Sequence, residues 1–208
     1  MTLGWNILGI LAWLILVLYL IFIVQNIRKR HLIMIVKDRK RFEWKTTLLD
    51  ILEVLLLLCG AIYMFSITLF YNPDLENKQV LSSKIEYQPL ILTAGNKRSY
   101  YVTAKSDNKK TPIQTYTFYS NGNRVTVTSN YATISDGKNP MSVQAGAIPY
   151  SSKQLVQADA RYQNAYVATY TATYKKNWQN GLRMHAGKTA AKYYLIRVPD
   201  RTFVRELK

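Results

Sequence analysis

Residues 28 to 45 read RKRHLIMIVKDRKRFEWK, with eight Lys or Arg side chains and two acids. This stretch lies between two long apolar runs, GWNILGILAWLILVLYLIFIV over residues 4 to 24 and LLDILEVLLLLCGAIYMFSITLF over residues 48 to 70. The first run has no charged residue and would extend about 32 Å as a helix, close to the thickness of the hydrocarbon core of a bilayer. The second has only Asp50 and Glu53, both in its first two turns. We therefore expect two transmembrane helices joined by a basic loop.

The basic stretch also indicates the orientation of the two helices. Short cytoplasmic loops collect Lys and Arg close to the membrane, and acidic residues count little in this rule. Residues 1 to 6 carry no basic side chain, and residues 72 to 92 carry only Lys78 and Lys84. The residues that place the loop at the inner leaflet are Arg28, Lys29, Arg30, Lys37, Arg39, Lys40, Arg41 and Lys45.

The charge rule predicts a two-pass protein of the plasma membrane whose N- and C-termini are both extracytoplasmic. Its regions would be transmembrane helix 1 over residues 1 to 27, a basic cytoplasmic loop over 28 to 46, transmembrane helix 2 over 47 to 71 and an extracytoplasmic domain over 72 to 208. In a cleaved signal peptide basic residues precede the apolar run, whereas here they follow it. We therefore expect the first helix to remain as an anchor.

Residues 72 to 208 are the strongly basic part of the chain. They carry 20 basic and 8 acidic side chains, net +12, whereas residues 1 to 71 have a net charge of +4. Such an excess favours polyanionic partners, which outside a cell are anionic wall polymers, lipid headgroups or nucleic acid. The alternative is a basic surface without a specific partner. If this domain were cytoplasmic instead, its charge and its 13 tyrosines would favour nucleic-acid binding by phosphate contacts and stacking.

The only cysteine, Cys59, lies in the second apolar run. Residues 72 to 208 therefore have no disulfide and must be stabilised by their core alone. Their composition is rich in Thr, Tyr, Val and Ser, which favour strands, so we expect a β-rich (α+β) domain. The clearest element is YTFYSNGNRVTVTS over residues 116 to 129, where Asn121-Gly122 predicts a hairpin turn. Alternation places four apolar side chains on one face of it, namely Tyr116, Phe118, Val125 and Val127.

Other elements follow from shorter patterns. We expect strands over residues 84 to 93, 99 to 105, 192 to 198 and 201 to 207, and a helix with a serine N-cap over 151 to 165. The run YVATYTATY over 166 to 174 places three tyrosines on one side of a strand. This tyrosine side is either a binding platform or part of the core, and the shortage of Leu and Phe favours the core.

Catalytic signals are weak. The two histidines are His31 and His185, and the outer domain has no cysteine, so it can form neither a His/Cys metal site nor a cysteine nucleophile. The pairs Ser83-Lys84 and Ser152-Lys153 have no framing motif. Facing carboxylates would require Asp136 to meet Asp159 or Glu86, and nothing in the sequence indicates that they do. We expect no enzyme activity, no cofactor and no metal.

Asp50 and Glu53 share one face of the second helix because they are three residues apart. Acids in a membrane helix indicate a function or a partner, although so near the helix start they can reach the interface or pair with Lys45 or Arg41. The segment HLIMIV, from residue 31, is too short to span a membrane. It would form either an interfacial helix over residues 32 to 36 or a strand paired with RFEWKT.

The layout WNILGILAWLILVLYLIFIVQNIRKR, then KDRKRFEWKTTLLDILEVLLLL, then a basic Tyr- and Thr-rich β domain resembles small uncharacterised two-span membrane proteins of lactic acid bacteria. The resemblance covers nearly the whole chain and rests on layout. It implies the envelope of a Gram-positive bacterium and carries no catalytic motif.

These patterns favour a non-enzymatic, membrane-anchored envelope protein whose outer domain binds an anionic polymer, lipid headgroups or a partner protein. The candidates for polyanion binding are Lys97, Arg98, Lys109, Lys110, Lys175, Lys176, Tyr100, Tyr101 and Tyr174. A second hypothesis is an accessory subunit of a membrane transporter or sensor, contacting its partner through Asp50, Glu53, Cys59, Gly60 and Ala61. A third is an enzyme that modifies the cell wall or lipid.

Overall fold

The computed structural model describes residues 3–36, 42–95, 98–106, 113–136 and 143–207. The chain divides into two compact units. The helical unit consists of residues 1–73 together with residues 174–188, and the β unit consists of residues 74–173 together with residues 189–208. Each unit is described by itself.

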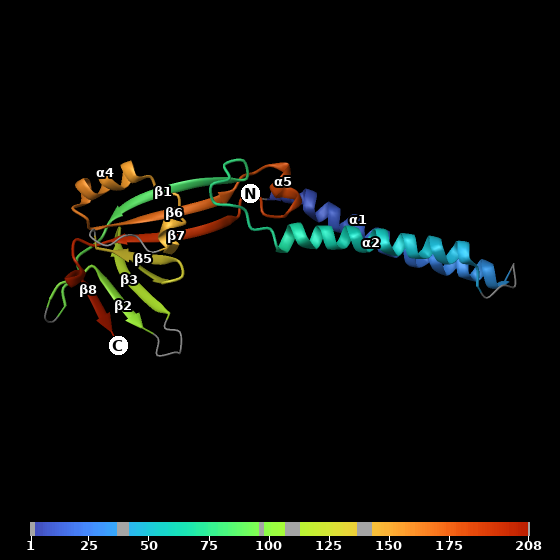
Figure 1. The fold of residues 1–208 in the computed structure, drawn as a ribbon, viewed down its shortest axis with the longest axis horizontal. Helices are drawn as coiled ribbons and strands as arrows, with labels where there is room; N and C mark the ends of the chain where they lie inside the picture. Colours follow the sequence, from blue (N-terminus) through green and yellow to red (C-terminus); the bar gives the residue numbers. More distant parts are fainter. Residues whose placement is uncertain (1–2, 37–41, 96–97, 107–112, 137–142, 208) are drawn as a thin grey trace. The chain divides into compact units, whose positions relative to one another are not determined.

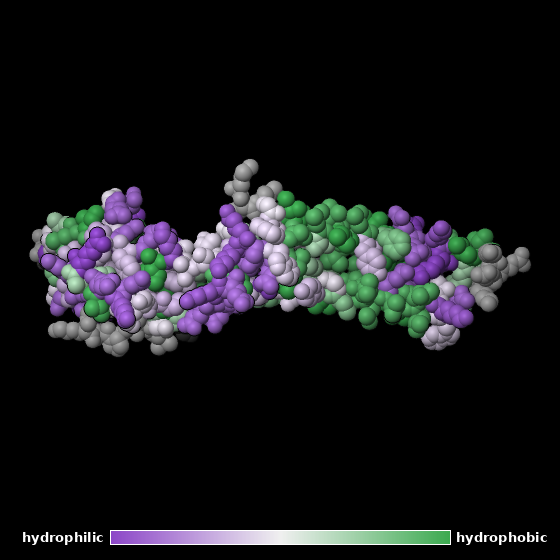
Figure 2. Space-filling model, turned by 90° about the horizontal axis from the view of Figure 1, so that it is seen from above, coloured by the Kyte–Doolittle hydropathy of each residue, from purple (hydrophilic) through white to green (hydrophobic). Residues whose placement is uncertain are grey.

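The helical unit is built on α1 (Leu3–Val36) and α2 (Trp44–Leu69). Both helices are long and apolar enough to cross a membrane. In the most apolar 18 residues of each helix, only 11% of α1 and 6% of α2 is buried. The core helix of a soluble protein would be mostly buried, whereas here hydrophobic side chains cover most of the helical surface, in green in Figure 2. The helices pack against each other, with the rings of Trp13 and Phe65 edge to face at 5.9 Å.

The first helix is longer than we expected. Residues 28 to 36, which we placed in the connecting loop, continue α1 without a break, so the strand alternative for residues 32 to 36 is wrong. Residues 10 to 36 contain neither glycine nor proline, so neither residue type interrupts helical hydrogen bonding in this part of α1. The second helix likewise begins at Trp44, ahead of the predicted residue 47. The loop residues 37 to 41 lie outside the described residues.

The β unit contains two mixed four-stranded sheets (Figure 1). The first has the order β1-β6-β7-β5, formed by β1 (Leu81–Pro89), β6 (Tyr166–Tyr174), β7 (Thr189–Arg197) and β5 (Ala132–Ser135). The second has the order β4-β3-β2-β8, formed by β4 (Asn123–Thr128), β3 (Gln114–Ser120), β2 (Val102–Ser106) and β8 (Val204–Leu207). The pairs β5 with β7 and β2 with β8 are parallel. Short helical elements complete the chain: α3 (Val143–Gly146), α4 (Ser152–Tyr162), α5 (Trp178–Leu182) and the 3-10 turn η1 (Arg201–Phe203).

The β unit has three layers (Figure 1). The two sheets enclose one core, in which Val102 and Phe118 of the second sheet pack with Val167 and Ile196 of the first. On the other face of the first sheet, α4 packs through Ala158 into a second cluster. Because side chains alternate along a strand, the second sheet buries one face and exposes the other to solvent.

Several sequence predictions are confirmed. The hairpin turn lies at Asn121 and Gly122, which both have positive φ, and the expected face of β3 and β4 belongs to the core. The predicted helix over 151 to 165 is α4, with Ser151 at its N-cap. The tyrosine side of β6 packs inward, since Tyr166 and Tyr170 are fully buried, and the platform alternative is therefore wrong. The strand β5 was not predicted.

Candidate functional site

The solvent face of the second sheet carries an open groove. Val102 and Ala104 of β2 point into the core, so Thr103 and Lys105 point outward, and the same alternation holds along the sheet. We call this the outer groove; it encloses 420 Å³. It is lined by Thr93, Tyr100, Tyr101, Thr103, Lys105, Thr115, Thr117, Tyr119, Arg124, Thr126, Arg205 and Leu207.

The floor of the groove is a row of side chains that crosses all four strands. Strand pairing aligns Arg205 of β8 with Thr103 of β2, Thr103 with Thr117 of β3, and Thr117 with Thr126 of β4. The hydroxyl oxygens of Thr117 and Thr126 lie 3.3 Å apart. A floor of hydroxyl groups can donate to and accept from an oxygen-rich ligand.

The charged residues of the groove all have the same sign. Lys105, Arg124 and Arg205 are exposed, and none of the described residues that line the groove is acidic. Within the described part of the chain, none of the three forms an ion pair. The guanidinium of Arg205 lies 5.4 Å from the centre of the Tyr100 ring. A groove with several cations and no acid raises the local concentration of anions.

The polyanion candidates do not form a single cluster. Tyr100 and Tyr101 line the outer groove, and Arg98 is exposed two residues before them, where its carbonyl accepts from the Gly95 amide. Lys97, Lys109 and Lys110 lie outside the described residues. Lys175 and Lys176 are exposed at the start of the β6–β7 connection, in the helical unit. Tyr174 is buried and stacks on His185, so it does not offer its ring to a ligand.

Sequence reasoning missed the cations that do line the groove. Lys105, Arg124 and Arg205 each have no other basic residue within two positions, so a search for adjacent basic residues passes over them. The alternation of core-facing and solvent-facing residues along each strand identifies them. Each lies next to an apolar residue of the core face, namely Ala104, Val125 and Val204.

Two of the three carboxylates named as catalytic candidates, Asp159 and Glu86, pair with basic side chains. Asp159 of α4 receives hydrogen bonds from Arg197 Nη2 at 2.8 Å and from the Tyr166 hydroxyl at 2.9 Å. Burial lowers the pKa of Arg197, but the hydrogen bond and charge of Asp159 outweigh burial and raise it. Glu86 pairs with Lys84 at 2.6 Å. Asp159 and Glu86 therefore each face a cation, not a second carboxylate.

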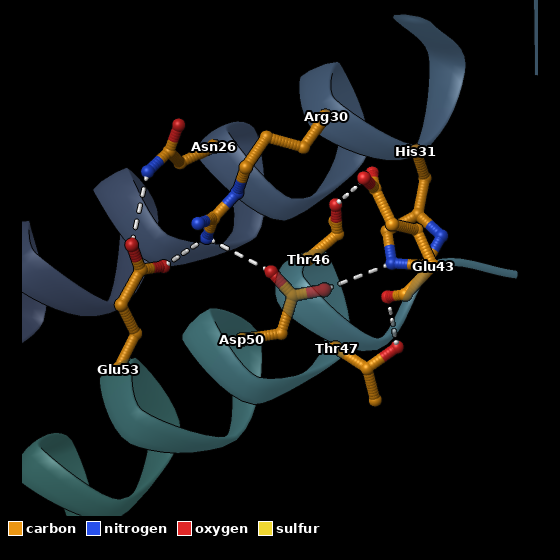
Figure 3. Close-up of polar contacts among 8 residues, drawn as sticks. All are labelled: Asn26, Arg30, His31, Glu43, Thr46, Thr47, Asp50 and Glu53. Atoms are coloured by element: carbon orange, nitrogen blue, oxygen red, sulfur yellow. Dashed lines mark hydrogen bonds and ion pairs between the residues drawn. The ribbon is translucent and has the colours of Figure 1, made fainter. Parts of the chain in front are cut away.

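A second polar site lies between α1 and α2 (Figure 3). Arg30 Nη2 contacts Asp50 at 2.9 Å and Glu53 at 2.5 Å. His31 Nε2 lies 2.9 Å from the other oxygen of Asp50, and Asn26 donates to Glu53 at 3.2 Å. The partners of the two acids therefore all come from residues 26 to 31 of α1, and both acids contact Arg30.

The other membrane-partner candidates do not share one face of α2. Gly60 faces α1, because a Cβ there would lie 3.1 Å from Leu16 Cδ2. Cys59 is exposed, and Ala61 lies on an open apolar surface with Ile62 and Phe65. Of the basic residues assigned to the inner leaflet, Arg28, Lys29 and Lys45 are exposed and Arg30 turns towards α2. Lys37, Arg39, Lys40 and Arg41 lie outside the described residues.

The fold defines a class: two long apolar N-terminal helices followed by an α+β domain with two mixed four-stranded sheets. A family model matches residues 4 to 205, which is nearly the whole chain. The chain belongs to this family, which is named after a Lactobacillus protein and whose function is uncharacterised. No curated protein and no solved structure matches the chain.

Proposed function

We propose that this is a membrane-anchored protein of the cell envelope that binds an anionic polymer in the outer groove, without enzymatic activity. Helices α1 and α2 form the anchor, the basic connection between them is cytoplasmic, and the β unit is extracytoplasmic. The observation that carries the binding proposal is the set Lys105, Arg124 and Arg205, three exposed cations on a floor of hydroxyl groups, with no ion pair among the described residues.

The helical unit supports placing the N-terminus on the same side as the β unit. Asn6, at the start of α1, exchanges hydrogen bonds with Ala186, in the connection between β6 and β7. That connection and the end of α2 both lead directly into the β unit along the chain. The basic connection lies at the opposite end of the helix pair, where the charge rule assigns it to the cytoplasm.

The spacing of the cations favours an extended ligand. Arg124 is on β4 and Arg205 on β8, the two edge strands of the sheet, so three strand spacings, about 14 Å, separate their backbones. A small anion can contact one of them at a time, whereas a polymer can contact both. Each exposed contact contributes about 1 kcal/mol or less, so useful affinity requires several contacts at once.

Aromatic residues suit the uncharged part of such a polymer. Tyr100, Tyr101 and Tyr119 line the groove, and tyrosine presents a flat apolar face with a polar edge. Such faces pack against sugar rings, while the threonines contact hydroxyl and phosphate oxygens. A wall polymer of alternating phosphate and polyol or sugar units presents both kinds of group.

The test is binding of purified teichoic acid to the full chain in nanodiscs of neutral lipid. We expect the triple variant K105Q/R124Q/R205Q to bind at least about tenfold more weakly, and wild-type binding to fall steeply with added salt. The matched control K84Q/K153Q/R161Q removes the same charge from exposed positions outside the groove. Equal losses in the two variants would show that net charge, and not the groove, binds the polymer.

A further inference from the structure

The connection between β6 and β7 has an unusual composition. Residues 174 to 188 read YKKNWQNGLRMHAGK, with four Lys or Arg side chains and no acid. They belong to the helical unit, and α5 within them packs against the first turns of α1. The connection is therefore a basic segment attached to the start of an apolar helix.

Two glycines allow α5 to contact α1 closely. A Cβ on Gly9 would lie 2.7 Å from the Leu182 carbonyl oxygen, and a Cβ on Gly181 would lie 2.7 Å from the Trp5 carbonyl carbon. Side chains larger than hydrogen do not fit at either position. The backbone of α5 is thereby held against residues 5 to 9 of α1.

Asparagines fix the conformation of the connection. Asn180 is fully buried. Its side-chain Nδ2 donates to the Lys175 carbonyl at 2.9 Å, and its backbone N–H donates to the Asn177 side chain at 2.9 Å. Asn6 joins the connection to α1 through two hydrogen bonds with Ala186. Hydrogen bonds within the connection and to α1 therefore fix its conformation.

The exposed side chains of the connection include tryptophan and lysine. Trp178 of the connection is 59% exposed, and Trp5 of α1 is 46% exposed. Lys175, Lys176 and Lys188 are exposed as well. Tryptophan is enriched at the level of lipid headgroups, and basic residues close to a membrane are attracted to anionic lipids.

The depth of α5 follows from its contact with α1. Residues 5 to 9 form the first turns of the apolar run, so on the membrane placement proposed above they lie where α1 enters the hydrocarbon core. A segment packed beside these turns lies among the headgroups. We propose that residues 174 to 188 bind the anionic phospholipid headgroups of the leaflet at the N-terminal end of α1, with Trp178 in the interface. This inference rests on the proposed membrane anchor and is independent of the outer groove.

The experiment uses tryptophan quenching by brominated lipid in nanodiscs that contain the full chain. One variant retains only Trp178 (W5F/W13F/W44F), and another retains only Trp13 in the apolar run (W5F/W44F/W178F). We expect both tryptophans to be quenched. At equal mole fraction, brominated phosphatidylglycerol should quench Trp178 more strongly than brominated phosphatidylcholine does, with little preference at Trp13.

Adding K175Q/K176Q to the Trp178 variant should abolish the preference for phosphatidylglycerol, whereas adding the control pair K153Q/R161Q, on α4, should retain it. Quenching at Trp13 but not at Trp178, or equal quenching of Trp178 by the two lipids, would overturn the headgroup site and leave the anchor intact. Absence of quenching at Trp13 would overturn the anchor, and the headgroup site with it. Teichoic acid binding by the groove is measured separately in neutral nanodiscs, so its failure is distinguishable from both.

Discussion

Asn6 and Ala186 are 180 residues apart in the chain and exchange two hydrogen bonds, at 3.1 Å from Asn6 Nδ2 to the Ala186 oxygen and at 3.0 Å from the Ala186 amide to Asn6 Oδ1. The side-chain amide of Asn6 thus pairs with the backbone in the way one strand pairs with another. The contact ties the start of α1 to the β6–β7 connection.

The variant N6A should release that connection from α1. The Ala186 carbonyl loses its hydrogen bond from Asn6, with an expected cost of about 1 to 3 kcal/mol if it is left unsatisfied, whereas the Ala186 amide retains its bond to the Asn180 carbonyl at 3.2 Å. Hydrogen exchange should become faster in residues 180 to 188. The control N26A removes a side-chain hydrogen bond at the other end of α1 and should leave this segment protected. Unchanged exchange in N6A would show that the pairing contributes little.

The close approach of α5 to α1 predicts different results for two glycines. G181A places a methyl group against the Trp5 backbone and should separate α5 from α1, increasing exchange in residues 178 to 186. G146A, at the end of α3, meets nothing within 4 Å and should be neutral or slightly stabilising. Thermal unfolding of both variants in the same detergent checks this. Equal unfolding temperatures would contradict the close packing at Gly181.

Arg30 is the arginine that contacts both Asp50 and Glu53 between the helices, so removing it alone should be costly. R30M leaves Asp50 and Glu53 half-buried with one fewer cation, and we expect a loss of about 3 kcal/mol. The triple variant R30M/D50L/E53L removes Arg30 together with both acids and should recover most of the loss. Unfolding of the helix pair in detergent measures both. A triple variant less stable than R30M would show that the acids have another favourable role.

His185 should titrate below its ordinary range. Burial lowers its pKa, with smaller contributions from Lys188 and Arg183. Because the folded state binds the proton less readily than the unfolded state, the stability contributed by neutral His185 is present above about pH 6.5 and decreases as the pH falls below it. Proton NMR of the H31Q variant, which retains His185 as its one histidine, gives the pKa directly. A pKa above 6.5 would contradict the burial argument.

The proposed topology predicts that protease added to intact protoplasts digests the β unit. The matched control is a cytoplasmic protein of the same cells, which must survive. Digestion of residues 72 to 208 with the control intact is the expected outcome. Protection of the β unit would place it in the cytoplasm, and its net charge of +12 would then direct the search to nucleic acid.

Local patterns predicted the elements that depend on neighbouring residues. Asn121-Gly122 predicted the hairpin because its turn needs two positive φ angles. Alternation grouped the tyrosines of β6 on one side, and the shortage of Leu and Phe favoured the core for that side. The strand β5 was missed, since it is four residues long and its pairing with β7 is parallel and distant in sequence. The helical extension of α1 to Val36 was missed because charge was read as a loop signal, although Lys and Arg are good helix formers.

The sequence by itself determined the two long apolar helices, the basic stretch between them and the β-rich character of the rest, because each of these depends on composition and periodicity over adjacent residues. Only the tertiary structure decided which residues meet. Lys105, Arg124 and Arg205 share one groove through strand pairing, and Arg30 meets Asp50 and Glu53 through helix packing. Contacts between residues far apart in the chain depend on strand order and packing, which leave no periodic signal in the sequence.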